Sequence, residues 1–210
     1  MSDLTALSSK EFLEKLASNA PTPGGGGGSA MAGALAAALT SMVGNLTTGK
    51  EKFAEHEVEV QDILSKAEAL RLRMLELVNA DAEVFKAFMV CYRLPKSTEG
   101  EKLARAEAIE NSAKQAAEVP FEIAQACLTV MKLAERIAVI GNHGAITDAA
   151  CSAILGRAAM RSAMYNVVVN LKLIKDNTYN EAIYAKLEVM EKEAEALEKI
   201  TLATTDAVLG

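Results

Sequence analysis

Tryptophan is absent from this 210-residue chain, and aromatic residues make up only 4% of it. Its three cysteines, Cys91, Cys127 and Cys151, lie far apart among apolar neighbours, so neither a disulfide framework nor a metal-binding pair is expected. Reduced cysteines are typical of a reducing compartment. The first residues have neither the basic nor the apolar region of a signal peptide. We therefore expect a cytoplasmic protein without a metal site.

Long basic runs are also missing, and the formal net charge is −6. A general nucleic-acid binder or a protein of anionic membrane surfaces would need the opposite balance. The segment 29–49 has no charged residue, and its length raises the question of a membrane span. However, alanine, glycine, serine and threonine dominate it, which favours a buried helix that packs closely against its neighbours. We expect neither nucleic acid nor a membrane as a partner.

No segment alternates polar and apolar residues with a period of two, whereas strong helix formers such as alanine, leucine and glutamate are abundant. A serine or threonine followed three residues later by a glutamate forms a capping box that starts a helix. This pattern occurs at Ser8 and Glu11, at Thr98 and Glu101, and at Thr178 and Glu181. The sequence predicts a single all-α domain over residues 1–210, a bundle of about seven helices with long antiparallel members. The expected helices cover residues 8–20, 29–49, 51–93, 98–118, 120–141, 148–175 and 178–210.

A run of five glycines lies near the N-terminus in the stretch PTPGGGGGSA. It consists of Gly24, Gly25, Gly26, Gly27 and Gly28. Ordering glycine costs more conformational entropy than ordering any other residue, so the run needs a reason. It immediately precedes the expected start of a helix, whose free N–H groups favour anions and polar ring atoms. We interpret it as a glycine-rich binding loop in which a ligand approaches the backbone itself.

Asp81 stands in the apolar stripe of the long helix expected over residues 51–93. The stripe has spacings of 4, 3, 4, 3 and 4 and consists of Met74, Val78, Asp81, Phe85, Phe88 and Tyr92. A carboxylate in such a stripe is costly unless it has a partner or a purpose. Two interpretations stay open. Asp81 is either a structural residue bonded to a neighbouring helix, or a functional one whose pKa is raised by burial, as suits proton transfer near neutral pH.

Four further polar residues are candidates for binding. Asn166 and Asn170 are four apart on an otherwise apolar helix and share one face, so they need partners, either other helices or a ligand rich in amide groups. Asn142 and Asp148 belong to the turn GNHGAITD. Asp148 is well placed there to cap the next helix, which would fully explain its presence.

Lys50 and Lys96 lie near the two ends of the long helix. Both are expected to be solvated, unless helix ends meet across an interface and form a basic patch. Lys50 also ends the stretch GNLTTGK, which nearly matches a phosphate-binding loop. Glu51 stands where that loop needs a hydroxyl, and no strand precedes it, so nucleotide hydrolysis is not expected.

Several stretches, taken together and in this order, carry a family resemblance. They are APTPGGGGGSA with its small-residue helix, MVGNLTTGKEKF, NADAEVFKAF, RLPKSTEGEK, VP at 119–120, GNHGAITDAACSA and NVVVNL. As a set they resemble the cyclodeaminase/cyclohydrolase family of folate enzymes, and the resemblance covers almost the whole chain. The family comprises the C-terminal domain of formiminotransferase-cyclodeaminase and stand-alone bacterial methenyltetrahydrofolate cyclohydrolases. This sequence departs from the family pattern at Thr147, where a serine is usual, and in its fifth glycine.

The resemblance implies an all-helical homodimer that binds a tetrahydrofolate derivative as its substrate, without a tightly bound cofactor, in a cleft near the subunit interface. It makes Asp81 the proton-transfer residue in the hydrolysis of methenyltetrahydrofolate to formyltetrahydrofolate. The residues expected to bind substrate are Gly24–Gly28, Lys50, Lys96, Asn142, Asp148, Asn166 and Asn170, with the two lysines near the glutamate tail. A formiminotetrahydrofolate cyclodeaminase, which releases ammonia, and a non-catalytic helical scaffold are the alternatives.

Overall fold

The computed structural model describes residues 3–210, and all regular structure in that range is helical, as predicted. It has six α-helices where the sequence predicted about seven, together with three short 3-10 helices. In chain order the elements are η1 (Leu4–Ala6), α1 (Ser9–Leu16), α2 (Gly25–Asn45), η2 (Glu51–His56), α3 (Glu57–Cys91), α4 (Glu99–Ile140), η3 (His143–Ala145), α5 (Ile146–Leu171) and α6 (Asn177–Leu209).

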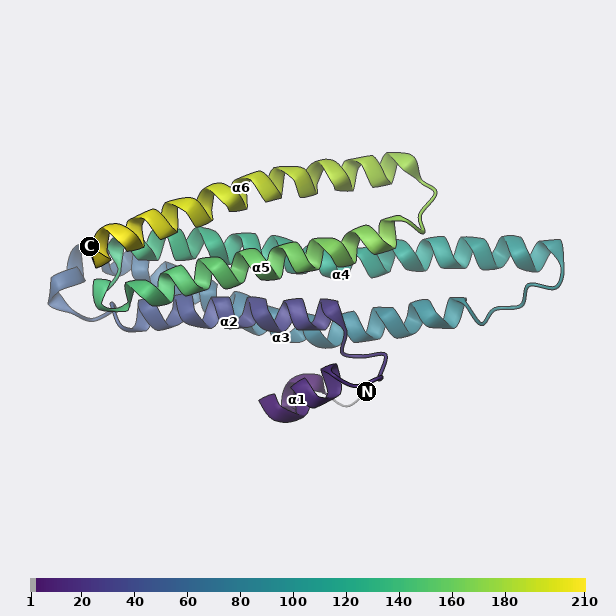
Figure 1. Ribbon diagram of the computed structural model, residues 1–210, viewed down its shortest axis with the longest axis horizontal. Coiled ribbons are helices and arrows are strands. Elements are labelled where there is room, and N and C mark those ends of the chain that lie inside the picture. The colour runs from purple at the N-terminus through teal and green to yellow at the C-terminus, as the bar shows by residue number, and fades with distance from the viewer. Residues whose placement is uncertain (1–2) are drawn as a thin grey trace.

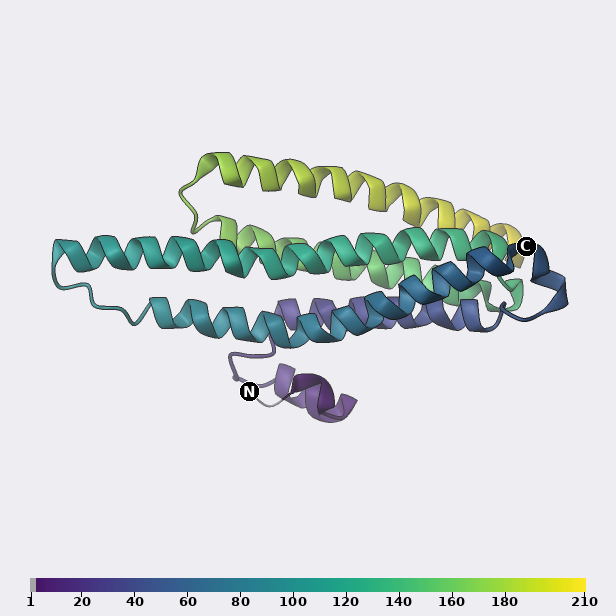
Figure 2. The same ribbon diagram turned by 180° about the vertical axis from the view of Figure 1, so that it is seen from behind.

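Helices α2 to α5 form an antiparallel four-helix bundle, in which each helix packs against the next and α2 also packs against α5 (Figures 1 and 2). Helix α6 lies outside this bundle, against α4 and α5. The N-terminal segment contacts α3 through η1, and its Leu4 and Phe12 join the core. Two features matter below. The α3–α4 hairpin extends beyond the other helices at one end, and α2 and α5 lie side by side with no helix in front of them in Figure 1.

Helix α2 packs closely in the bundle because its side chains are small and uncharged. At Gly33, an added Cβ atom would lie 2.7 Å from Cε of Met74 in α3. At Gly156 of α5, it would lie 2.9 Å from Cγ of Met131 in α4. The mean hydropathy of α2 reaches 1.2 over its most apolar 18 residues, which would suit a membrane span. However, 61% of this 18-residue segment is buried inside the bundle. The structure thus places the uncharged segment in the core, as predicted.

Helix starts were predicted correctly where a complete capping box is present. Ser8 and Thr98 each accept a hydrogen bond from the backbone N–H three residues later, and the glutamate at that position accepts one from the N–H of the capping residue. The third predicted box, at Thr178, is wrong. Asp176 caps α6 instead, because its carboxylate accepts the N–H of Tyr179 at 3.0 Å.

Pro120 does not start a helix, contrary to the prediction, but lies inside the unbroken 42-residue α4. A proline inside a helix offers no N–H to the carbonyl four residues earlier, which here belongs to Ala116. That carbonyl accepts a hydrogen bond from Asn170 of α5 instead, with an Nδ2–O distance of 3.0 Å. A side chain of the neighbouring helix therefore satisfies the group that the proline leaves free, and two predicted helices merge into one.

Candidate active site

The sequence predicted a loop for the glycine run, and this prediction is wrong. The run forms the N-cap and first turn of α2. Gly24 is the N-cap, and the N–H of Gly28 bonds to its carbonyl oxygen at 2.9 Å. Glycine is a poor helix former, so its use here needs a local cause. At Gly26, that cause is the close approach of Asp81 from α3. An added Cβ at Gly26 would lie within 2.7 Å of all three atoms of the Asp81 carboxyl group.

Asp81 is half-buried at the N-terminal end of α2. Its Oδ2 accepts the N–H of Gly27 at 2.9 Å, whereas its Oδ1 has no hydrogen-bond partner among residues 3–210. Burial raises the pKa of Asp81 above its ordinary value, and the hydrogen bond from Gly27 opposes this shift without cancelling it. Oδ2 is thus bonded to a neighbouring helix, as the structural interpretation expects, while the unpartnered Oδ1 leaves the functional interpretation open.

A cavity of about 260 Å³ opens beside Asp81, between the N-terminal end of α2, the C-terminal part of α3 and the C-terminal end of α5. Its apolar wall consists of Val84, Phe85, Phe88, Val169 and Leu173. Gly25 and Gly26 also line it, and in the described part of the chain neither of their N–H groups meets an acceptor. The cavity therefore combines one carboxylate, two free backbone donors and an apolar surface.

The two predicted asparagines complete the polar lining of the cavity. Asn170 uses both N–H bonds of its amide, to the carbonyls of Ala116 (3.0 Å) and Asn166 (2.8 Å), so its Oδ1 is left as an acceptor. Asn166 donates one N–H to the carbonyl of Ser162 (2.8 Å) and retains the other together with its Oδ1. A flat ring with its own amide-like donors and acceptors suits such a lining, and a positive charge on the ligand suits Asp81.

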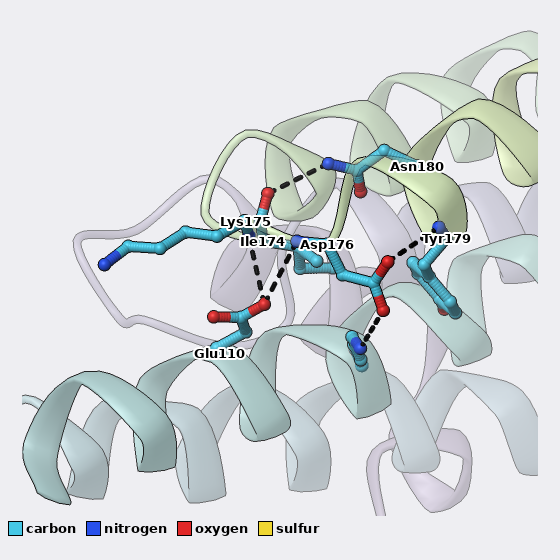
Figure 3. Close-up of polar contacts among 7 residues, drawn as sticks. Glu110, Ile174, Lys175, Asp176, Tyr179 and Asn180 are labelled. Atoms are coloured by element: carbon cyan, nitrogen blue, oxygen red, sulfur yellow. Dashed lines mark hydrogen bonds and ion pairs between the residues drawn. The ribbon is translucent and has the colours of Figure 1, made fainter.

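The turn between α5 and α6 follows directly after the cavity residues and is fixed to α4 (Figure 3). Glu110 of α4 accepts the backbone N–H groups of Lys175 (3.1 Å) and Asp176 (3.2 Å). Asn180 of α6 donates to the carbonyl of Ile174 at 2.9 Å. These contacts hold the turn on which Leu173 lies, and with it one wall of the cavity.

A wider groove of about 470 Å³ lies between α5 and α6. Two of the charged residues in its lining, Arg161 and Glu191, form an ion pair at 3.4 Å. Glu191 also holds the buried Arg157 through two hydrogen bonds of 2.7 and 2.8 Å. The groove has no carboxylate comparable to Asp81 with a free oxygen beside backbone donors, so the cavity at Asp81 is the better candidate for chemistry.

Asn142 and Asp148 lie at the opposite end of the bundle from this cavity. Asn142 is occupied there, because its backbone N–H bonds to Oγ1 of Thr47 (2.9 Å) and its Nδ2 to the carbonyl of Leu46 (3.0 Å). Asp148 is not the predicted N-cap, since α5 already begins at Ile146 and Asp148 lies in its first turn.

The two lysines lie at different ends of the molecule. Lys50 follows α2 and is separated from Gly25 by the length of that helix, about 30 Å at 1.5 Å per residue. Lys96 lies in the α3–α4 connection, on the extended hairpin at the same end as the cavity. One chain therefore brings together only part of the predicted set. Gly24–Gly26, Asp81, Asn166 and Asn170 line the cavity, whereas Gly27, Gly28, Lys50, Lys96, Asn142 and Asp148 do not.

Sequence reasoning missed the aromatic wall of the cavity. Phe85 and Phe88 were recognised only as members of the apolar stripe, although their positions four and seven residues after Asp81 place them on its face of the helix. Ala116 gave no signal of its own, because it contributes only a backbone carbonyl. Within residues 3–210, no three histidine, cysteine, aspartate or glutamate side chains gather as metal ligands would.

Comparisons with known proteins identify the family of this chain. The family model described as formiminotransferase-cyclodeaminase matches residues 8–189. A methenyltetrahydrofolate cyclohydrolase of Methylorubrum extorquens is 45% identical over 89% of this chain and 89% of its own. The formimidoyltransferase-cyclodeaminase of Mus musculus is 28% identical over 97% of this chain, which spans 38% of that longer protein. The crystal structure of a formiminotetrahydrofolate cyclodeaminase from Thermotoga maritima superposes with a TM-score of 0.88 at 32% identity, covering 98% of both chains. The resemblance inferred from the motifs is confirmed.

Proposed function

The chain belongs to the formiminotransferase-cyclodeaminase family, and we propose that it is a methenyltetrahydrofolate cyclohydrolase, which hydrolyses methenyltetrahydrofolate to formyltetrahydrofolate. The observation that carries this proposal is the half-buried Asp81, whose Oδ1 is free beside a cavity lined with amide groups. The 45% identity to a relative of that name, over nearly the full length of both chains, supports it. A non-catalytic scaffold would leave this carboxylate and the two free N–H donors unexplained.

The chemistry follows from the substrate, a cyclic amidinium cation with an electrophilic carbon between two nitrogens. Ionised Asp81 attracts the cation and accepts a proton from the attacking water as the new C–O bond forms. In the neutral adduct, Asp81 returns this proton to one ring nitrogen as the C–N bond breaks and its electron pair moves to that nitrogen. The hydroxyl proton of the adduct is released to solvent when the C=O bond forms. Water plus cation thus yields the formyl product and one proton.

The decisive assay follows the near-ultraviolet absorbance of methenyltetrahydrofolate above its spontaneous decay. In Asp81→Asn, which is nearly isosteric, we expect kcat to fall about 10²-fold or more while the fold is retained. Because Asp81 acts as the base in its ionised form, kcat/KM of the unmodified protein should rise with pH through the raised pKa of this residue. Full activity of Asp81→Asn would assign Asp81 a purely structural role and refute this mechanism.

Formiminotetrahydrofolate cyclodeaminase is the second candidate function. The structural neighbour from Thermotoga maritima, with 98% coverage of both chains, favours it. In that reaction a folate nitrogen attacks the formimino carbon and ammonia leaves, so the same carboxylate can accept and return the proton. Ammonia release from formiminotetrahydrofolate, compared with methenyl hydrolysis at equal enzyme concentration, decides between the two.

A homodimer is part of the proposal, and the open face of α2 and α5 supports it. The exposed side of α2 is an uncharged stripe with spacings of 4, 3, 4, 3 and 4, made by Gly28, Ala32, Leu35, Leu39, Met42 and Leu46. Leu35 and Met42 are 55% and 47% exposed, which is costly for a helix face that meets only water. A repeat of 3.5 residues suits pairing with another helix at a small crossing angle.

An antiparallel two-fold pairing of this face would explain the separated site residues. The face begins at Gly25 and Asn166, which line the cavity, and runs to the opposite end of α2. A two-fold axis through its middle sets the far end of one subunit beside the cavity of the other. In this arrangement the partner supplies Lys50, and Asp148 lies at the same end.

Mixing Asp81→Asn with Lys50→Met tests this shared site. If Lys50 acts on the cavity of the partner, a mixed dimer of Asp81→Asn and Lys50→Met has one intact site, made of Asp81 from one chain and Lys50 from the other. Random exchange of subunits makes half of the dimers mixed, so about a quarter of the full activity should return. If Lys50 acts within its own chain, no mixture regains activity, and the shared site is refuted. Unmixed variants carried through the same exchange serve as controls.

The remaining expectations complete the proposal. We infer a folate derivative as substrate with no tightly bound cofactor, and neither nucleic acid nor a membrane as partner. The net charge of −6 supports the exclusion of nucleic acid. A cytoplasmic location is supported by the three free cysteines, of which Cys127 is buried with its thiol pKa raised to about 12 by desolvation.

A further inference from the structure

The extended α3–α4 hairpin is basic in an otherwise acidic chain. Residues 86–105 contain five lysines and arginines but two glutamates, whereas the whole chain has a net charge of −6. In the described part of the protein, Lys102 alone among these five has an acidic partner, Glu99 at 2.6 Å. Apolar side chains lie exposed among these charges, with Met89 and Tyr92 each 41% exposed. Such a surface suits an anionic ligand that also has an aromatic part.

Arg105 of α4 is the best oriented of these cations. Its Nη2 donates to the carbonyl of Tyr92 at 3.2 Å, and its guanidinium lies over the Tyr92 ring, 5.4 Å from the centroid. Its Nε is buried and has no hydrogen-bond partner among residues 3–210. The carboxylate one turn earlier, Glu101, is already engaged by the N–H groups of Ser97 (2.7 Å) and Thr98 (2.9 Å). A guanidinium that is held in place but lacks a carboxylate is prepared to bind one from outside.

Aromatic side chains connect the cavity with Arg105. Phe88 lines the cavity and meets Tyr92 edge to face, with ring centroids 5.1 Å apart. Tyr92 lies 11 residues beyond Asp81 in the numbering, which corresponds to a rise of about 16 Å along the helix. An aromatic ring and one or two glutamyl units can span this distance, since an extended residue adds about 3.5 Å and a γ-linked unit adds more.

We propose that Arg105 is a specificity-determining residue that binds a carboxylate of the glutamate tail of the folate substrate. The p-aminobenzoyl ring of the substrate then lies along Phe85 and Phe88, between the reacting carbon at Asp81 and the hairpin. This inference rests on the proposed function. It assigns the tail to the hairpin that also carries Lys96.

Two substrates that differ only in the tail test the proposal. Methenyltetrahydropteroate has the same reacting ring and the same p-aminobenzoyl group as methenyltetrahydrofolate but lacks glutamate. In Arg105→Met, we expect KM for the folate to rise about 10-fold or more with kcat unchanged, because a charge-assisted hydrogen bond is lost. KM for the pteroate should change less than about 2-fold. Arg105→Lys, which keeps the charge but not the planar fork, should give an intermediate loss for the folate alone.

Lys102→Met is the matched control, because it removes one positive charge from the same helix at a side chain that already has a partner. We expect it to leave the KM values of both substrates unchanged. An equal rise in KM for folate and pteroate in Arg105→Met would overturn the proposal, and so would an unchanged KM for the folate. Direct binding of both compounds is measured in parallel. A chain that binds the folate but hydrolyses neither compound would refute the proposed function, while the ratio of the two binding constants still decides the role of Arg105.

Discussion

Gly26→Ala is the smallest change that separates the position of Asp81 from its chemistry. The substitution adds one methyl group in the first turn of α2 and removes no functional group. That methyl group would lie 2.5 Å from Cγ and 2.7 Å from Oδ2 of Asp81, well inside any real carbon contact. Because the carboxyl is the end of a short side chain, it must move by about 1 Å or more, and its hydrogen bond from Gly27 is strained or lost.

The size of the expected effects follows from these distances. A misplacement of about 1 Å can lower a rate about 10²-fold, so kcat should fall by about that factor. The free energy of unfolding should change far less. Alanine improves helix propensity by up to about 1 kcal/mol. Loss of the bond between Gly27 and the carboxylate costs about 1–3 kcal/mol. We therefore expect a net loss of about 2 kcal/mol or less.

Gly100→Ala is a control at the equivalent position, since Gly26 and Gly100 are both the second residue of a long helix. An added Cβ at Gly100 meets no atom within 4 Å. Turnover and urea unfolding of both variants give the comparison. Gly100→Ala should keep full activity. If Gly26→Ala also turned over methenyltetrahydrofolate at the normal rate, the position of the Asp81 carboxylate would not matter and the reasoning would be wrong.

Three further changes test other parts of the structure. Burial raises the pKa of Asp81, so the folded protein holds its proton more tightly than the unfolded chain, whose carboxyl has the ordinary value of 3.8. The free energy of unfolding therefore falls as pH rises from about 4 through the raised pKa. Over that range, urea titrations should show the stability of Asp81→Asn increasing relative to that of the unmodified protein. Leu35→Glu should give monomers in light scattering, whereas Val58→Glu, at a side chain 87% exposed on α3, should leave the mass unchanged. Pro120→Ala should raise the midpoint of urea unfolding, since it restores an N–H to the helix, but increase KM about 3-fold or more by competing with Asn170 for the carbonyl of Ala116.

The helical architecture was predictable because its signals are local. The capping boxes at Ser8 and Thr98 contain both partners of the cap within four residues, and both were confirmed. The apolar spacing around Asp81 likewise identified a residue that proved to lie in a cavity. Where the deciding contact comes from elsewhere in the chain, the prediction failed. Pro120 lies inside α4 because Asn170 of α5 binds the carbonyl that the proline leaves free, and no residue near Pro120 indicates that contact.

Gly26, Asp81 and Pro120 each violate a local rule, and each violation is at least partly compensated by a residue that lines the cavity or bonds to one that does. Glycines are poor helix formers, yet Gly26 opens α2 because the carboxyl of Asp81 occupies the space of a side chain. Asp81 is costly in an apolar stripe, and the N–H of Gly27 offsets part of this cost. Pro120 leaves the carbonyl of Ala116 without its helical N–H partner, and Asn170, which lines the cavity, donates its Nδ2–H to that carbonyl. If these residues only stabilised the fold, ordinary helix formers at the same positions would stabilise it more, and no compensating contacts would be needed. Their convergence around a single carboxylate is therefore a functional argument that the structure makes independently of any relative.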